Sequence, residues 1–436
     1  MKRLWLALIT LVLGCSLVAA CSSSGGDNAD SAESAGKVSL SWWTWWPQAP
    51  ELAAAWNKTH PDIQIKVEDV GGGAEQSAKL AAAIKAGQGP DIALAEYEIL
   101  PQYLAEGIAM DISKYTSQLK SLYPPSVWSL VALNNGVYGV PADQGPMIMM
   151  FRPDLFAKYG LTVPTTWQEF ATDAKIIHTK NPNAYIADFN PTDGEFFAGL
   201  ARQAGAQWYQ NDNGTWSVGI NDAASKAVAS FWNNLISEGL VWTQPTGTPA
   251  YYKMIAQNDL LTIPGGSWNT ATPGTAATAP NEIGKWRVGP LPQWTAGDPM
   301  VSFAGGSSNI VTTTSKYPEQ SAEFLSWLGT STAGTTALVK IQGILPGSLP
   351  GQQVFKTIPV PQNYLPAGQA NYGQVLLSAS SNTSSVTWGP NSETAFTDYS
   401  DAVFAAVTNK TSLVNALNTV QQQVVSNLES SGYKVK

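Results

Sequence analysis

The chain has 436 residues and a formal net charge of −8, and only 13% of its residues are charged. A sparsely charged acidic surface argues against nucleic acid and against an anionic membrane face as a partner. The histidines His60 and His178 are too few for a zinc site of several imidazoles, and they leave little material for a Ser-His-Asp triad. We therefore expect no metal, no cofactor and no nucleic acid.

The first 20 residues have the layout of a secretory signal peptide. A basic start precedes the almost entirely apolar stretch 4–13, and small residues lead into Cys21. A cysteine after Val-Ala-Ala resembles the bacterial lipobox, in which the thiol is acylated and the cysteine becomes the new N-terminus. We expect a signal peptide over 1–20 and a lipid anchor on Cys21. Cys15 is a weaker alternative, because it leaves a shorter apolar core.

The segment after Cys21 differs in composition from the rest of the chain. Residues 22–36 read SSSGGDNADSAESAG, which is small, polar and acidic. Such a segment cannot bury enough apolar surface to fold, so we predict a flexible linker over 21–37. The remaining body of about 400 residues suggests two domains or lobes.

The first part of the body alternates predicted strands and helices. Apolar or alternating runs predict strands at 38–43, 63–67 and 91–95. Helical patterns fall at 50–58, 74–86 and 101–106. This alternation argues for a mainly parallel sheet with helices on both faces. Ligands bind beyond the carboxyl ends of the strands in such sheets, so the residues that follow each strand are site candidates.

Further elements follow in the second part of the chain. Thr166 and Glu169 have the spacing of a capping box, which predicts the start of a helix that runs to about His178. Other predicted strands and helices are 137–141, 147–151, 223–238, 260–263, 318–330 and 413–428.

A series of sequence blocks carries a resemblance to a known family. The body resembles the extracellular carbohydrate-binding proteins of ABC importers, the maltose-binding-protein-like family, from Val38 onward. The blocks occur in the family's order and include HPDIQIKVE, KLAAAIKAGQGPDIAL, VYGVPADQGPMIMMFRPDLFAKYGLTVPTTWQEF, LTIPGGSWNT and WRVGPLP. Each block is weak evidence by itself, whereas the ordered series is strong evidence.

The resemblance implies an α/β, two-lobed periplasmic-binding-protein-like fold. Each lobe is expected to be a mainly parallel sheet flanked by helices, and the lobes close over a ligand held in the cleft between them. The implied boundaries are 38–142 and 305–346 for lobe 1, 146–300 and 360–436 for lobe 2, and hinge crossings near 142–146, 301–305 and 346–360.

The family also implies a function. We expect a monomeric, non-enzymatic lipoprotein on the outer face of the cytoplasmic membrane. It would capture a sugar or oligosaccharide and deliver it to the permease subunits of an ABC transporter.

A sugar site should combine aromatic rings, which cover the C–H faces, with polar side chains that bind the hydroxyls. Trp45 and Trp46 lie at the end of the first predicted strand, and Trp268 follows a Gly-Gly pair predicted to form a turn. The resemblance supports Trp268 and adds positions that match the family's ligand contacts: Glu96, Tyr97, Asp143, Gln144, Asp193, Glu195, Phe196, Gly305, Gly306 and Trp388. Each of these also has a purely structural explanation as a packing, turn or helix-start residue.

Three other functions remain open from the sequence. A secreted carbohydrate-active enzyme would need two carboxylates at a defined separation, and Asp193 and Glu195 have no identified facing partner. The same fold could bind a polyamine, a peptide or ferric iron instead. A membrane-tethered receptor or adhesin could use the fold without import.

Overall fold

The computed structural model describes residues 37–271 and 279–436. The predicted signal peptide, Cys15, Cys21 and nearly all of the predicted linker lie outside the described residues. Within the described residues, no helix is both long enough and apolar enough to cross a membrane.

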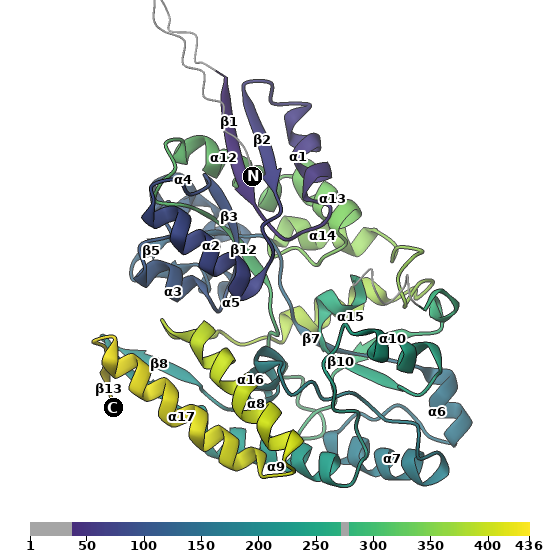
Figure 1. Cartoon of the computed structure of the whole chain (residues 1–436). Helices are drawn as coiled ribbons and strands as arrows, with labels where there is room; N and C mark the ends of the chain where they lie inside the picture. The colour runs from purple at the N-terminus through teal and green to yellow at the C-terminus, as the bar shows by residue number, and fades with distance from the viewer. Residues whose placement is uncertain (1–36, 272–278) are drawn as a thin grey trace, which may run out of the picture. The chain divides into compact units, whose positions relative to one another are not determined.

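The first lobe is built on a five-stranded sheet in the order β2-β1-β3-β12-β6 (Figure 1). Its strands are β1 (Val38–Trp43), β2 (Ile63–Glu68), β3 (Ile92–Glu96), β12 (Ser307–Val311) and β6 (Val140–Pro141). The first three are parallel, as predicted, whereas β12 runs antiparallel to β3 and to β6. The N-terminal helices also form where predicted, as α1 (Ala49–Asn57), α2 (Gly73–Lys85) and α3 (Leu100–Ala105).

Aromatic side chains fill the core of this lobe. Trp42 is fully buried on β1, and its ring makes edge contacts with Trp46 and Phe324. The indole Nε1 of Trp42 donates a hydrogen bond of 2.9 Å to the side chain of Asn309 on β12. Phe324 belongs to α12 (Pro318–Thr330). Chain segments far apart in sequence are thus joined in one core, which fixes the carboxyl ends of β1 and β3.

The second lobe contains the three-stranded sheet β10-β7-β11. Its strands are β10 (Thr262–Gly266), β7 (Met147–Phe151) and β11 (Arg287–Pro290). Both pairings are antiparallel, so the expected mainly parallel sheet is wrong for this part of the second lobe. The pattern of apolar residues reports burial but not strand direction, and both faces of β7 are buried.

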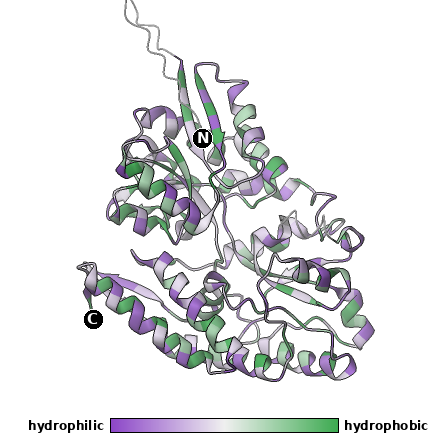
Figure 2. Ribbon diagram, viewed as in Figure 1, coloured by the Kyte–Doolittle hydropathy of each residue, from purple (hydrophilic) through white to green (hydrophobic). Residues whose placement is uncertain are grey.

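Helices make up much of the second lobe. They include α7 (Trp167–Lys180), α8 (Gly194–Gln203), α9 (Ala223–Ser237), α16 (Ser392–Thr408) and α17 (Leu413–Ser430). The predicted capping box is present at α7, where the Thr166 hydroxyl accepts from the Glu169 amide and Glu169 binds back. Figure 2 shows hydrophobic and hydrophilic residues alternating along α16 and α17, as expected for helices that bury one face.

Two strand predictions differ from the structure. The single strand predicted over 137–141 is split into β5 (Gly136–Val137), which pairs with β4 (Ala132–Leu133), and β6, which joins the main sheet. Residues Gly265 and Gly266 belong to β10 and do not form a turn after it. Their lack of side chains instead lets neighbouring groups approach the strand closely.

Three segments connect the two lobes. The first lies between β6 and β7, the second between β11 and β12, and the third between α14 (Leu349–Thr357) and α15 (Tyr372–Ser381). The first two are hydrogen-bonded to each other, because the Ala304 amide donates to the Gly145 carbonyl at 2.9 Å and the Met147 amide donates to the Ser302 carbonyl at 2.8 Å.

Candidate functional site

A cavity of about 550 Å³ lies between the two lobes. This volume falls within the range of about 300–1,000 Å³ that is typical of small-molecule sites. The predicted site residues that line it are Trp45, Trp46, Glu96, Asp143, Glu195, Trp268, Gly305 and Gly306. The structure therefore gathers residues that are spread over more than half of the sequence.

Strand ends explain why these residues converge. Trp45 follows β1, Glu96 is the last residue of β3, and Gly306 directly precedes β12. The carboxyl ends of parallel strands face the same edge of a sheet, which is the edge where ligands bind. Asp143 also fixes the first connection between the lobes, because its Oδ1 accepts a 2.7 Å hydrogen bond from the amide of Ser307.

Trp268 is the most exposed aromatic side chain of the site. It follows β10 in the short helix η2 (Ser267–Ala271), and 40% of its surface is accessible. Its indole Nε1 donates a 2.9 Å hydrogen bond to the carbonyl of Ala304. Gly305 adopts a φ of +70°, and a Cβ there would lie 3.1 Å from the Trp268 Nε1. The ring is thus held at the second connection and stays partly exposed.

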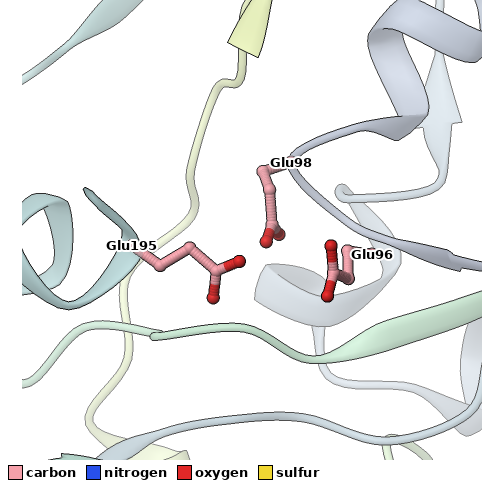
Figure 3. A group of neighbouring side chains, drawn as sticks. All are labelled: Glu96, Glu98 and Glu195. Atoms are coloured by element: carbon pink, nitrogen blue, oxygen red, sulfur yellow. The ribbon is translucent and has the colours of Figure 1, made fainter. Parts of the chain in front are cut away.

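Three carboxylates meet at the boundary between the lobes. Glu96 is the last residue of β3, Glu98 lies in the turn that follows, and Glu195 comes from the first turn of α8. Their carboxylate oxygens lie within 4.8 Å of one another. Figure 3 shows Glu195 reaching from its helix toward the other two side chains.

Burial changes the protonation of this cluster. It raises the pKa of Glu96 to about 8 and that of Glu98 to about 7, and it raises the pKa of Glu195 well above its ordinary value. The neighbouring carboxylates add to the shift of Glu96 and Glu195. A protonated carboxyl donates as well as accepts hydrogen bonds. The cluster can therefore pair with hydroxyl groups in both directions near neutral pH.

Among the described residues, these three side chains have the spacing needed to hold a hard cation. A carboxylate must be ionised to bind such an ion. Because burial raises the pKa of all three groups, binding of such an ion would release protons from the cluster.

Some predicted residues lie outside this cavity. Tyr97 is 2% exposed, and its hydroxyl donates to the carbonyl of Asp143 at 2.7 Å. The Gln144 side chain donates to the Pro346 carbonyl at 3.1 Å and accepts from the Ser380 hydroxyl at 2.8 Å. Both side chains thus connect chain segments at the crossings between the lobes.

Trp388 is also nearly buried and does not line the cavity around Trp268. The Arg202 guanidinium lies 4.8 Å from the centre of its ring. Together with Tyr97, Trp388 lines a separate cavity of about 870 Å³. Its contacts indicate a packing role.

Asp193 and Phe196 line a smaller cavity beside the main one. Asp193 also caps α8, because its Oδ1 accepts a 2.9 Å hydrogen bond from the amide of Phe196. Glu195 and Trp268 line both cavities, which makes them the boundary between the two.

Sequence reasoning missed several lining residues. Lys340 and Gln342 come from the π-helical segment η4 (Leu338–Gln342), and Asn363 and Tyr364 come from the loop before α15. A π-helical turn is often a sign of a functional site, but it leaves no pattern in the sequence. Glu98 could have been found, because it lies in the turn directly after β3, among the residues that follow a strand end.

A sequence model of the bacterial extracellular solute-binding protein family matches residues 47–335. The chain belongs to this family. The solute-binding protein is also 26% identical over 285 residues to the lactose-binding protein of Rhizobium radiobacter. That alignment covers 63% of this chain and 65% of the relative, so the chain spans slightly less than two thirds of the relative's length.

Two solved structures resemble this solute-binding protein over most of its length. One is the galacto-N-biose-/lacto-N-biose I-binding protein of the ABC transporter from Bifidobacterium longum, in complex with lacto-N-biose. It is 25% identical, with a TM-score of 0.83, and the match covers 92% of this chain and all of that one.

The other is the ABC transporter associated binding protein from B. animalis subsp. lactis, in complex with beta-1,6-galactobiose. It is 26% identical, with a TM-score of 0.81 and the same coverage of both chains. These likenesses confirm the predicted two-lobed α/β fold.

Proposed function

We propose that this solute-binding protein captures a short oligosaccharide between its lobes and delivers it to the permease of an ABC transporter. The observation that carries the proposal is the composition of the cavity between the lobes. Trp268 offers a partly exposed indole ring there, and Glu96 and Glu195 offer hydrogen-bonding groups from opposite lobes.

This arrangement suits the two kinds of surface on a sugar. The indole face covers the C–H groups of a ring, and the carboxyl groups bind the hydroxyls at its rim. A ligand that contacts Glu96 on one lobe and Glu195 on the other stabilises the closed form more than the open form. That difference in free energy is what allows a permease to distinguish loaded from empty protein.

The relatives support a carbohydrate and a transporter as the partners. The matched protein of R. radiobacter is named for lactose, and the two similar structures contain disaccharides and belong to ABC transporters. We also propose that the lipid on Cys21 and the linker over 21–37 hold a monomeric protein at the outer face of the membrane. Such a tether raises its effective concentration near the permease.

A polyamine is the second candidate ligand. The cavity is lined by Glu96, Asp143 and Glu195, and Lys340 is the one basic side chain among its described lining residues. An acidic cavity with aromatic walls also suits an amine cation.

A ligand screen by thermal denaturation separates these candidates, because a ligand that binds the folded state raises the melting temperature. Lactose, lacto-N-biose, β-1,6-galactobiose, maltose and cellobiose form the sugar panel, and spermidine and putrescine form the amine panel. We expect at least one disaccharide to raise the melting temperature. A rise with the amines alone contradicts the proposal.

The closeness of the carboxylates also raises the question of glycoside hydrolysis, which uses two such groups. Incubation of each disaccharide with the protein, followed by measurement of released monosaccharide, tests it. We expect no turnover, and sustained release would replace the binding function with an enzymatic one.

A further inference from the structure

The smaller cavity beside the main one belongs almost entirely to the second lobe. Its volume is about 160 Å³. Asp188 and Asn190 line it from the segment before α8, and Tyr251 and Tyr252 line it from α10 (Pro249–Ala256). Because Trp268 lies between this cavity and the main one, a ligand could extend past the indole ring from one into the other.

Asp188 is the unexplained feature of this cavity. The residue is only 7% exposed, and its Oδ1 accepts no hydrogen bond from any described residue. A buried carboxylate oxygen without a donor costs free energy, so such atoms are uncommon in folded proteins unless a ligand or water pairs with them. The Oδ1 atom of Asp188 is therefore free to accept a hydrogen bond from a ligand.

The electrostatics around Asp188 favour a neutral donor. Burial raises its pKa to about 7, and the nearby Asp193 adds to the shift. Its charge also contributes to the raised pKa of the Tyr251 hydroxyl, which shows that the two groups are near each other. A sugar hydroxyl can pair with Asp188 in either protonation state, because a carboxyl group accepts in both and donates when protonated.

The size and walls of the cavity fit a single sugar ring. An engineered cavity of about 150 Å³ in another protein holds benzene, so a cavity of this volume admits a six-membered ring. The aromatic rings of Trp268, Tyr251 and Tyr252 supply apolar surfaces, and Asp188 and Asn190 supply polar partners. This is the combination that a pyranose ring requires.

We propose that this cavity is a subsite for the terminal ring of the ligand, with Asp188 as its hydrogen-bonding anchor. The inference rests on the proposed function and adds a minimum length for the ligand. One ring occupies the Asp188 cavity, and the next ring lies against Trp268 in the cavity between the lobes. The protein then selects solutes of at least two linked rings and binds monosaccharides weakly.

Titration calorimetry with β-1,6-galactobiose and with galactose, which is its single repeating unit, tests this length requirement. If the thermal screen favours another disaccharide, that sugar and its constituent monosaccharides take their place. We expect wild-type protein to bind the disaccharide at least tenfold more tightly than the monosaccharide. Equal affinity for the two overturns the subsite and leaves sugar binding intact.

Variants locate the effect in the cavity. Asp188→Ala removes both carboxyl oxygens and should weaken disaccharide binding about tenfold, while the binding of galactose changes less than about twofold. Asp62 is exposed, so Asp62→Ala is the matched control and should change neither affinity. If Asp188→Ala does not fold, Tyr252→Ala tests the same wall of the cavity and should also weaken the binding of the disaccharide more than that of galactose.

The outcomes separate the two proposals. Wild-type disaccharide affinity in folded Asp188→Ala or Tyr252→Ala overturns the subsite, while loss of binding in Trp268→Ala still supports the proposed function. Absence of binding by wild-type protein to every sugar of the panel contradicts both.

Discussion

The carboxylate of Glu195, in the first turn of α8, lies within 4.8 Å of the carboxylate of Glu96, at the end of β3, although the two residues belong to different lobes. Two ionised carboxylates at this distance repel each other. The contact therefore costs free energy without a ligand unless at least one group carries a proton, and it links closure of the lobes to pH.

The sign of this pH dependence follows from the raised pKa values. Below about pH 4.5, both groups are protonated whether the lobes are closed or open, so closure carries no ionisation cost. Between that pH and about 8, the value for Glu96 in the closed form, an open form can ionise while the closed form keeps its protons. Rising pH therefore favours opening.

Small-angle scattering of the ligand-free protein measures this effect. We expect a larger radius of gyration at pH 8 than at pH 5, and Glu195→Gln should reduce the difference. The exposed Glu51→Gln is the matched control. The other charged groups around the cluster are Asp143, Asp193, Arg202 and Glu393. A radius that does not change with pH in the wild type contradicts the link.

Substitution of Trp388 by alanine should lower the free energy of unfolding far more than substitution of Trp268. Trp388 is 9% exposed and packs against Arg202, so its loss should lower the free energy of unfolding by about 3–5 kcal/mol. Trp268 is 40% exposed, so its loss should cost about 1 kcal/mol or less. Urea denaturation of both variants checks this difference, and equal losses of stability contradict the assigned roles.

Substitution of Gly305 should weaken ligand binding as well as strain the backbone. It has a φ of +70°, and an added Cβ would lie 3.2 Å from Glu195 and 3.1 Å from Trp268. Gly107 has a φ of +68° with open space around it, so it is a matched control. Both alanine variants should lose about 1 kcal/mol of stability.

Only Gly305→Ala should also weaken disaccharide binding, because only there does the new methyl group approach the site. Titration calorimetry of the two variants measures it. An equal effect of both substitutions on affinity would show that Gly305 matters through strain alone.

Cys21→Ser should release the protein from the membrane fraction, because the thiol that we propose to carry the lipid is lost. Cys15→Ser is the control, and the protein should stay with the membrane. Fractionation of cells that express each variant, followed by detection of the protein, measures this. Release by Cys15→Ser alone would move the anchor to that residue.

The sequence predicted the first lobe well because its strands are simple apolar runs between helices. The rule that ligands bind at strand ends correctly placed Trp45 and Glu96 at the cavity between the lobes. Tyr97, in the turn after β3, lies outside that cavity, because its side chain is buried and its hydroxyl donates to the carbonyl of Asp143. The resemblance alone could not distinguish an exposed ring such as Trp268 from a buried one such as Trp388.

Other features depend on contacts that no local pattern reveals. Lys340, in η4, and Asn363, in the loop before α15, line the cavity although both are far in sequence from the strand ends that form its other walls. The antiparallel sheet around β7 arises from pairing with β10 and β11, which are far away in sequence. The unpartnered oxygen of Asp188 likewise becomes visible only once its surroundings are known.

The most direct test of sugar capture is titration calorimetry of wild-type protein and Trp268→Ala with the disaccharide panel. The account predicts saturable binding of at least one disaccharide by the wild type, weakened roughly tenfold or more in a variant that stays folded. Unchanged affinity in folded Trp268→Ala, or heat of binding with polyamines alone, would contradict it.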